Sequence, residues 1–161
     1  MKSIVVYTDG ATKETNPGAG GYGAVILKDG SVVKELMGGY SFTTNNRQEL
    51  LAVIHALEYL KREKEFKVTI YSDSQYVVNS IELKWVYGWA KKANFKNKKN
   101  EDLWREFISL HGHFELTMKW IRGHSGIKWN ERADKLAGQA AYDEENHSED
   151  LGYLESIEKD S

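Results

Sequence analysis

Hydrophobic residues recur along the chain with two different periods, and the change from one period to the other marks the expected elements. Short runs rich in β-branched and aromatic residues predict five strands. They cover residues 4–8, 20–27, 32–40, 68–71 and 116–121. Apolar residues spaced three or four apart predict helices. The helices cover residues 46–60, 75 to about 92 with a break near Lys84, 101 to about 110, and 129–142.

Turn and capping residues support this division. Asp29-Gly30 lies between the second and third strands, where it is a strong signal for the tight turn of a β-hairpin. Asn45 or Asn46 is expected to cap the first helix, because a short polar side chain accepts hydrogen bonds from the free amides there. Three successive strands followed by alternating helices and strands indicate a mixed sheet with helices on its faces. The expected fold class is therefore α/β.

The composition fits one such domain and excludes several classes of protein. The chain has 161 residues, 40% of them apolar, which is enough for a hydrophobic core. It has no cysteine, so disulfides, a thiol nucleophile and thiolate zinc sites are excluded. No run approaches the roughly 20 apolar residues of a membrane helix, and the apolar run at residues 4–7 is too short for a signal peptide. We expect a soluble cytoplasmic protein with no membrane partner.

The net charge of −2 hides an uneven distribution. Residues 143–161 carry eight acids and one lysine, which leaves 16 acids and 21 bases, a charge of +5, in residues 1–142. A basic body favours a polyanionic partner. We place a boundary at residue 143 and expect the acidic tail to be a solvated, mobile terminus. A second hypothesis is that the tail inhibits the protein by competing for the basic surface.

Four acids occupy positions where an acid does not help folding. Asp9 and Asp73 each follow a predicted strand, Glu49 falls in the first turn of a predicted helix, and Asp134 lies within the last one. Each alone has an ordinary explanation, such as a favourable charge near a helix N-terminus for Glu49. If the strands before Asp9 and Asp73 are neighbours, their carboxylates meet at one edge of the sheet. Converging carboxylates repel each other, and oxygen ligands favour Mg²⁺ or Mn²⁺, two of which can clamp a phosphodiester.

Two further features suit chemistry on a nucleic acid. His124 lies in the glycine-flanked loop Arg122-Gly123-His124-Ser125-Gly126, where an imidazole can move toward a substrate and exchange protons near neutral pH. Residues 83–100 contain no acid, and six lysines are interleaved with aromatic residues. Lysines neutralise phosphates, while aromatic rings pack on sugars. A solvated basic helix with buried aromatic residues is the alternative interpretation of this segment.

Together these motifs resemble bacterial type 1 ribonuclease H in order and spacing. They are Thr8-Asp9-Gly10, Asn16-Pro17-Gly18, Thr44-Asn45-Asn46-Arg47 with Glu49, Asp73-Ser74-Gln75-Tyr76, Gly123-His124, and Asn130-Glu131-Arg132-Ala133-Asp134. The resemblance covers residues 4 to about 142. It implies a ribonuclease H-like fold, a five-stranded mixed sheet in the order 3-2-1-4-5 flanked by helices. It also implies a monomer that cleaves the RNA strand of RNA–DNA hybrids endonucleolytically, leaving 3′-hydroxyl and 5′-phosphate ends.

The resemblance also implies roles for individual residues. Asp9, Glu49, Asp73 and Asp134 would hold two Mg²⁺ ions, with Asp9 shared between them, and His124 would assist proton transfer or product release. The residues implied to contact the hybrid are Asn16, Thr44, Asn45, Gln75, Trp85, Trp89, Lys91, Lys92 and Asn100. Asn16, Asn45 and Gln75 would read the 2′-hydroxyl, whereas Thr44 and Asn100 would bind one DNA phosphate. Phe42 stands where the family often has arginine, so this phosphate pocket is expected to be weaker or differently built.

Two other functions compete with this interpretation. A hybrid-binding module that no longer cuts would have lost a metal ligand, yet all four acids are present. A structure-selective DNase of the same superfamily would share the four acids, but Asn16, Asn45 and Gln75 together with the lysine-rich segment favour hybrids. Cleavage of chimeric substrates would separate the two enzymes.

Overall fold

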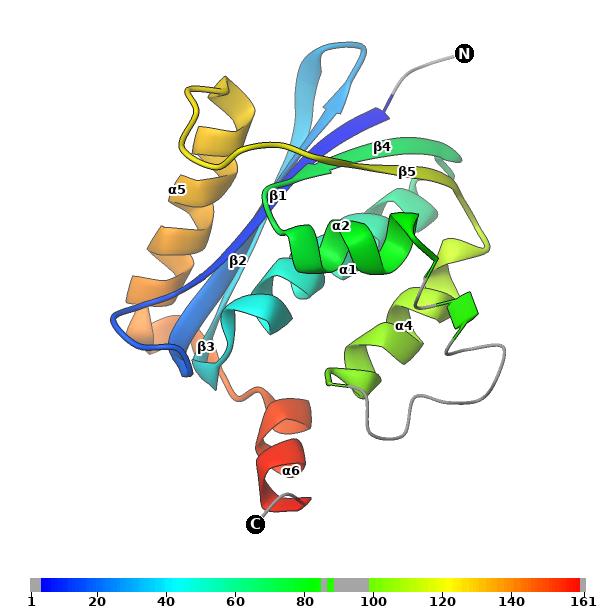
Figure 1. Cartoon of the computed structure of the whole chain (residues 1–161). Helices are drawn as coiled ribbons and strands as arrows, with labels where there is room; N and C mark the ends of the chain where they lie inside the picture. Colours follow the sequence, from blue (N-terminus) through cyan, green and yellow to red (C-terminus); the bar gives the residue numbers. More distant parts are fainter. Residues whose placement is uncertain (1–3, 85–86, 89–98, 160–161) are drawn as a thin grey trace.

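A six-stranded mixed sheet forms the centre of the molecule in the computed structural model, which describes residues 4–84, 87–88 and 99–159 (Figure 1). The strand order is β5-β4-β1-β2-β3-β6. The strands are β1 (Ile4–Thr12), β2 (Gly18–Lys28), β3 (Ser31–Thr43), β4 (Lys67–Ser72), β5 (Glu115–Trp120) and β6 (His147–Ser148). β1–β2 and β2–β3 are antiparallel, and the other three pairs are parallel. The predicted order 3-2-1-4-5 is confirmed, and β6 adds a sixth strand beside β3.

Helices cover both faces of this sheet (Figure 1). One face carries α1 (Asn45–Arg62), α2 (Gln75–Glu82) and α4 (Glu101–His111), and α5 (Lys128–Tyr142) covers the other. The short η1 (Glu144–Asn146) and α6 (Leu151–Lys159) follow α5. In Figure 1, α6 lies at the end of the molecule where α1 begins. The sheet therefore separates two packed layers.

The larger core lies between the sheet and α1, α2 and α4, and its largest fully buried side chain is Trp104. A second cluster lies under α5 and consists of Val25, Leu27, Ala133 and Leu136. Alternate strand residues point into the two layers, which is the pattern of a sheet covered on both faces. β1 and β4 are neighbours in this sheet, and the candidate site lies on these two strands.

Three local predictions need correction. β1 continues to Thr12 because it pairs with β2 up to Gly20, so Asp9 lies within the strand rather than after it. Thr44, not Asn45 or Asn46, caps α1, and its Oγ1 accepts a hydrogen bond from the amide of Arg47. With α1 starting at Asn45, Glu49 lies beyond the first turn. The predicted helix break near Lys84 is confirmed, since α2 ends at Glu82 and Lys84 has a φ of 62°.

The tail contacts the body at several points. His147–Ser148 pair with β3, and Asp150 is only 6% exposed. The boundary at residue 143 and the solvated, mobile tail stay predictions, although the buried Asp150 is not solvated. Buried ion pairing, described below, holds Asp150 in place. No helix within the described ranges is long and apolar enough to cross a membrane.

Candidate active site

Three carboxylates meet where β1, β4 and α1 come together. Thr8 and Ser72 are partners in the parallel β1–β4 register, so Asp9 and Asp73, one residue further on, lie side by side. Glu49 reaches them from α1. One ligand oxygen each from Asp9, Glu49 and Asp73 lies within 4.8 Å of the others. Asp134 approaches from α5, where its charge and a side-chain hydrogen bond act on Asp9. The predicted convergence of these four acids is therefore present.

Two glycines make this close approach possible. A Cβ on Gly10 would overlap the backbone of Gln48 and Glu49, so only glycine lets α1 pack this closely on β1. A Cβ on Gly123 would lie 2.6 Å from Oδ2 of Asp73. Glycine at these positions thus leaves space for the carboxylates on two sides of the site.

Burial and mutual repulsion disfavour the charged forms of these acids. Burial, and next the charge of Asp73, raises the pKa of Asp9 to about 8. Burial, followed by the charges of Asp9 and Asp73, raises the pKa of Glu49 well above its ordinary value. The pKa of Asp73 is raised mainly by burial and then by the charge of Asp134. The metal-free cluster therefore holds protons that ordinary carboxyl groups would have lost at neutral pH.

The donor set fits a divalent cation. Oε2 of Glu49 is buried and has no hydrogen-bond partner among the described residues, which is costly unless a ligand satisfies it. All the donors of the cluster are carboxylate oxygens, which hard cations such as Mg²⁺ and Mn²⁺ prefer. A bound cation would also favour the ionised forms that burial opposes. Asp9, Glu49, Asp73 and Asp134 are the residues that could hold it.

His124 lies beside this cluster on an exposed loop. Its φ is 54°, its side chain is 79% exposed, and Nδ1 is 3.9 Å from Oδ2 of Asp134. Glu131, to which sequence reasoning assigned no role, has a carboxylate oxygen within 4.8 Å of a ring nitrogen of His124 and of a carboxylate oxygen of Asp134. The loop thus places an exposed imidazole beside the acidic cluster.

The residues predicted to read the 2′-hydroxyl lie near the same end of the sheet. Oδ1 of Asn16 accepts from the amide of Asn45 at 3.1 Å. Oδ1 of Asn45 in turn accepts from the amide and hydroxyl of Thr12 at 2.7 and 2.8 Å. These bonds fasten the β1–β2 loop to the start of α1. Gln75 is exposed at the start of α2, two residues after Asp73.

The two residues predicted to bind a DNA phosphate both contact Arg47. The backbone amide of Arg47 donates a hydrogen bond to Oγ1 of Thr44 at 3.2 Å. Nη1 of the Arg47 side chain lies 3.5 Å from Oδ1 of Asn100. Phe42 packs on Tyr153 of α6, with ring centroids 5.7 Å apart. Four further predicted contacts, Trp85, Trp89, Lys91 and Lys92, lie outside the described residues.

Sequence reasoning missed a contact that supports Asp73. Trp120 is the last residue of β5, and its Nε1 donates to the backbone carbonyl of Asp73 at 3.1 Å. Tryptophan at a strand end is common, so the sequence carried no signal for this role. The closeness of Gly123 to Asp73 was also missed, because the glycine-flanked loop was interpreted only as freedom for His124.

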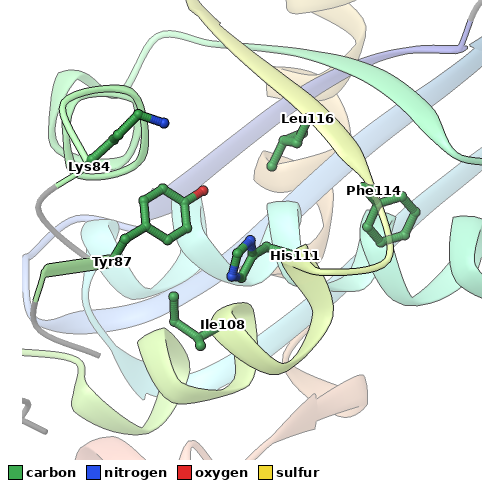
Figure 2. A pocket seen from close by; sticks show the side chains of 6 residues that line it. All are labelled: Lys84, Tyr87, Ile108, His111, Phe114 and Leu116. Carbon is green, nitrogen blue, oxygen red and sulfur yellow. The ribbon is translucent and has the colours of Figure 1, made fainter. Parts of the chain in front are cut away.

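A separate cavity of about 480 Å³ lies between the end of α2, α4 and β5. Figure 2 shows its six lining side chains, with the ring of Tyr87 beside that of His111. They are Lys84, Tyr87, Ile108, His111, Phe114 and Leu116. None of the four acids lines this cavity, so it is not part of the candidate active site.

Comparisons with known proteins identify the family of the chain. The family model for RNase H matches residues 1–142. Ribonuclease HI of Neisseria meningitidis serogroup B is 48% identical over 144 residues, which are 87% of this chain and 96% of that protein. The crystal structure of LC9-RNase H1, a type 1 RNase H with the type 2 active-site motif, is similar with a TM-score of 0.78 and 28% identity, covering 88% of this chain and 72% of that one. The structure of LC11-RNase H1 in complex with an RNA/DNA hybrid has a TM-score of 0.63 and 26% identity, covering 86% and 96%. From its sequence, its fold and its four acids, the chain belongs to the RNase H family, as a nuclease of the bacterial ribonuclease HI type.

Proposed function

We propose that this enzyme hydrolyses the RNA strand of RNA–DNA hybrids endonucleolytically and leaves 3′-hydroxyl and 5′-phosphate ends. The observation that carries the proposal is the buried cluster of Asp9, Glu49 and Asp73, joined by Asp134, in a member of the RNase H family. That a similar structure contains an RNA/DNA hybrid supports the choice of substrate. The lysines of residues 83–100 support it through their charge.

We propose that the four acids hold two Mg²⁺ ions, with Mn²⁺ as an alternative. Bound there, the ions would supply the Lewis acidity that activates a water and stabilises charge on the phosphate and the departing 3′ oxygen. As the resemblance to the family implies, Asp9 would be shared by both ions; one of its oxygens lies within 4.8 Å of an oxygen of Glu49 and of Asp73, and the charge of Asp134 acts on it. Glu49 and Asp73 would complete one site and Asp134 the other.

The other side chains of the site would bind the hybrid, orient it or move protons. His124 would carry a proton between solvent and the substrate, which its exposure allows. Asn16, Asn45 and Gln75 would distinguish RNA from DNA through the 2′-hydroxyl in the wide minor groove of the hybrid. Thr44 and Asn100 would bind one phosphate of the DNA strand, and Trp85, Trp89, Lys91 and Lys92 would extend that grip. We further propose that the enzyme acts as a monomer in the cytoplasm.

A chimeric duplex tests the proposal. One strand is DNA, and the other carries a short run of ribonucleotides flanked by deoxynucleotides. We expect cuts only within the ribonucleotide run, with 5′-phosphates that permit digestion by a 5′-phosphate-dependent exonuclease. Cuts in the deoxynucleotide flanks would favour a structure-selective DNase. Binding without cutting in Mg²⁺ and in Mn²⁺ would favour a hybrid-binding module.

A further inference from the structure

The most heavily bonded side chain of the tail is the Asp150 carboxylate, which is buried against the start of α1. Oδ2 accepts from Oγ1 of Thr43 at 2.7 Å and from Nε of Arg47 at 2.8 Å. Oδ1 accepts from Nη2 of Arg47 at 2.9 Å and from the amide of Tyr153 at 3.2 Å. One acid therefore caps α6 and binds the guanidinium of Arg47 through two hydrogen bonds, a geometry that is strong and directional.

Arg47 is fixed on its other side by α4. Its Nη1 and Nη2 bond the two oxygens of Asp102 at 2.8 and 2.6 Å, and its side chain is 2% exposed. Gly152 allows this fit, because a Cβ there would overlap Oδ2 of Asp102. The tail, α1 and α4 are thus joined through a single buried arginine held between two carboxylates.

The same arginine links the two residues proposed to bind a DNA phosphate. Thr44 accepts its hydrogen bond from the backbone of Arg47, which leaves the Thr44 hydroxyl hydrogen as a donor. Oδ1 of Asn100 accepts a hydrogen bond from Nη1 of Arg47, and Nδ2 of Asn100 donates to Oη of Tyr76 at 3.0 Å. An amide nitrogen carries two hydrogens, so Nδ2 keeps a second donor. Arg47 therefore bonds both residues, and each of them keeps a hydrogen-bond donor that a phosphate could use.

We propose that Asp150 is a positioning residue for hybrid binding: by holding Arg47, it keeps Thr44 and Asn100 at the separation that grips a phosphate of the DNA strand. This inference rests on the proposed function. It gives Asp150 a favourable part in substrate binding, contrary to the hypothesis that the acidic tail competes with the hybrid. It also explains how the pocket is held together with Phe42 in place of an arginine, since Phe42 packs on Tyr153 of the same tail.

The test compares Asp150→Asn with Glu149→Gln in steady-state cleavage of a hybrid, below the unfolding temperature of each variant. Glu149 is exposed and adjacent, so its variant removes one negative charge without touching Arg47. We expect the KM of Asp150→Asn to rise roughly threefold to tenfold with little change in kcat, the size of one or two lost hydrogen bonds. Glu149→Gln should keep the wild-type KM or lower it slightly. The double variant Arg47→Met/Asp150→Leu replaces the buried pair by apolar groups, which often preserves stability; it should fold and still show the raised KM.

A second readout separates positioning from general loosening of the fold. Hybrids are prepared in which one DNA phosphate at a time is replaced by an uncharged methylphosphonate. The wild-type enzyme should lose affinity sharply at one position, and Asp150→Asn should lose most of that sensitivity. The inference would be overturned if a folded Asp150→Asn variant kept the wild-type KM and an unchanged methylphosphonate profile. It would also be overturned if the KM fell in both Asp150→Asn and Glu149→Gln. Failure of the wild-type enzyme to cleave hybrids would instead overturn the proposed function.

Discussion

Replacement of Asp9 by asparagine should stabilise the metal-free protein while abolishing cleavage. Burial and the neighbouring acids raise the pKa of Asp9 from 3.8 to about 8. One pKa unit corresponds to about 1.4 kcal/mol, so at pH 7 the folded state loses at most about 4 kcal/mol relative to an ordinary carboxyl group. Water entry and local relaxation screen such charges, so we expect Asn to raise the free energy of unfolding by about 1–4 kcal/mol.

The sign of the pH dependence follows from the raised pKa. The unfavourable contribution of Asp9 is absent below its unfolded pKa of 3.8 and grows as the pH rises toward about 8. Urea unfolding in EDTA should therefore show equal stabilities for wild type and Asp9→Asn at about pH 4 and a widening gap up to about pH 8. Mg²⁺ should narrow this gap, because it stabilises the wild type by binding its folded state. Glu149→Gln is the control for removal of an exposed charge. A variant that is no more stable than wild type at about pH 8 in EDTA would refute the reasoning.

Three other substitutions test separate parts of the structure. His124→Ala should slow cleavage by roughly 10²–10⁴-fold and leave the unfolding temperature unchanged, since the ring is largely exposed; an unchanged rate would assign the ring no role in proton transfer. Gly10→Ala should destabilise the protein by about 1–3 kcal/mol in thermal unfolding and lower activity, because the new methyl group pushes α1 and Glu49 away from Asp9. Burial, and next Glu58, raise the pKa of Glu106 to about 7. Glu106→Gln should therefore stabilise the folded protein by less than about 1 kcal/mol above pH 7 and not at all near pH 4. Equal effects on the free energy of unfolding at both pH values would contradict this.

The order of elements and the four acids could be predicted because they depend on local pattern. The period of apolar residues marks each strand and helix, and Asp9 and Asp73 interrupt or end runs of β-favouring residues. The parallel pairing of β1 with β4 then brings them together without further information. Where pairing partners set a boundary, prediction failed: β1 continues past Asp9 only because β2 is long enough to pair with it.

The contacts of the tail could not be predicted, because they depend on residues about 100 positions apart. Acidic composition favours solvation, yet Asp150 is buried because Arg47 and Thr43 supply donors. Nothing near Asp150 in the sequence distinguishes it from exposed Glu149. The hydrogen bond from Nε1 of Trp120 to the carbonyl of Asp73 likewise joins residues that are far apart in the sequence. Capping at Thr44 rather than Asn45 was also not predictable, since the Asn45 side chain is engaged by Thr12 of β1.

The most direct test of the account is cleavage of a hybrid whose two strands carry different labels. The full-length wild-type protein is incubated with this duplex in Mg²⁺ and, separately, in EDTA. The account predicts that the labelled RNA strand is cut only in Mg²⁺ and that the labelled DNA strand stays intact in both. A cut DNA strand, or RNA cleavage that persists in EDTA, would contradict the assignment of Asp9, Glu49, Asp73 and Asp134 to metal-dependent hydrolysis of RNA in hybrids.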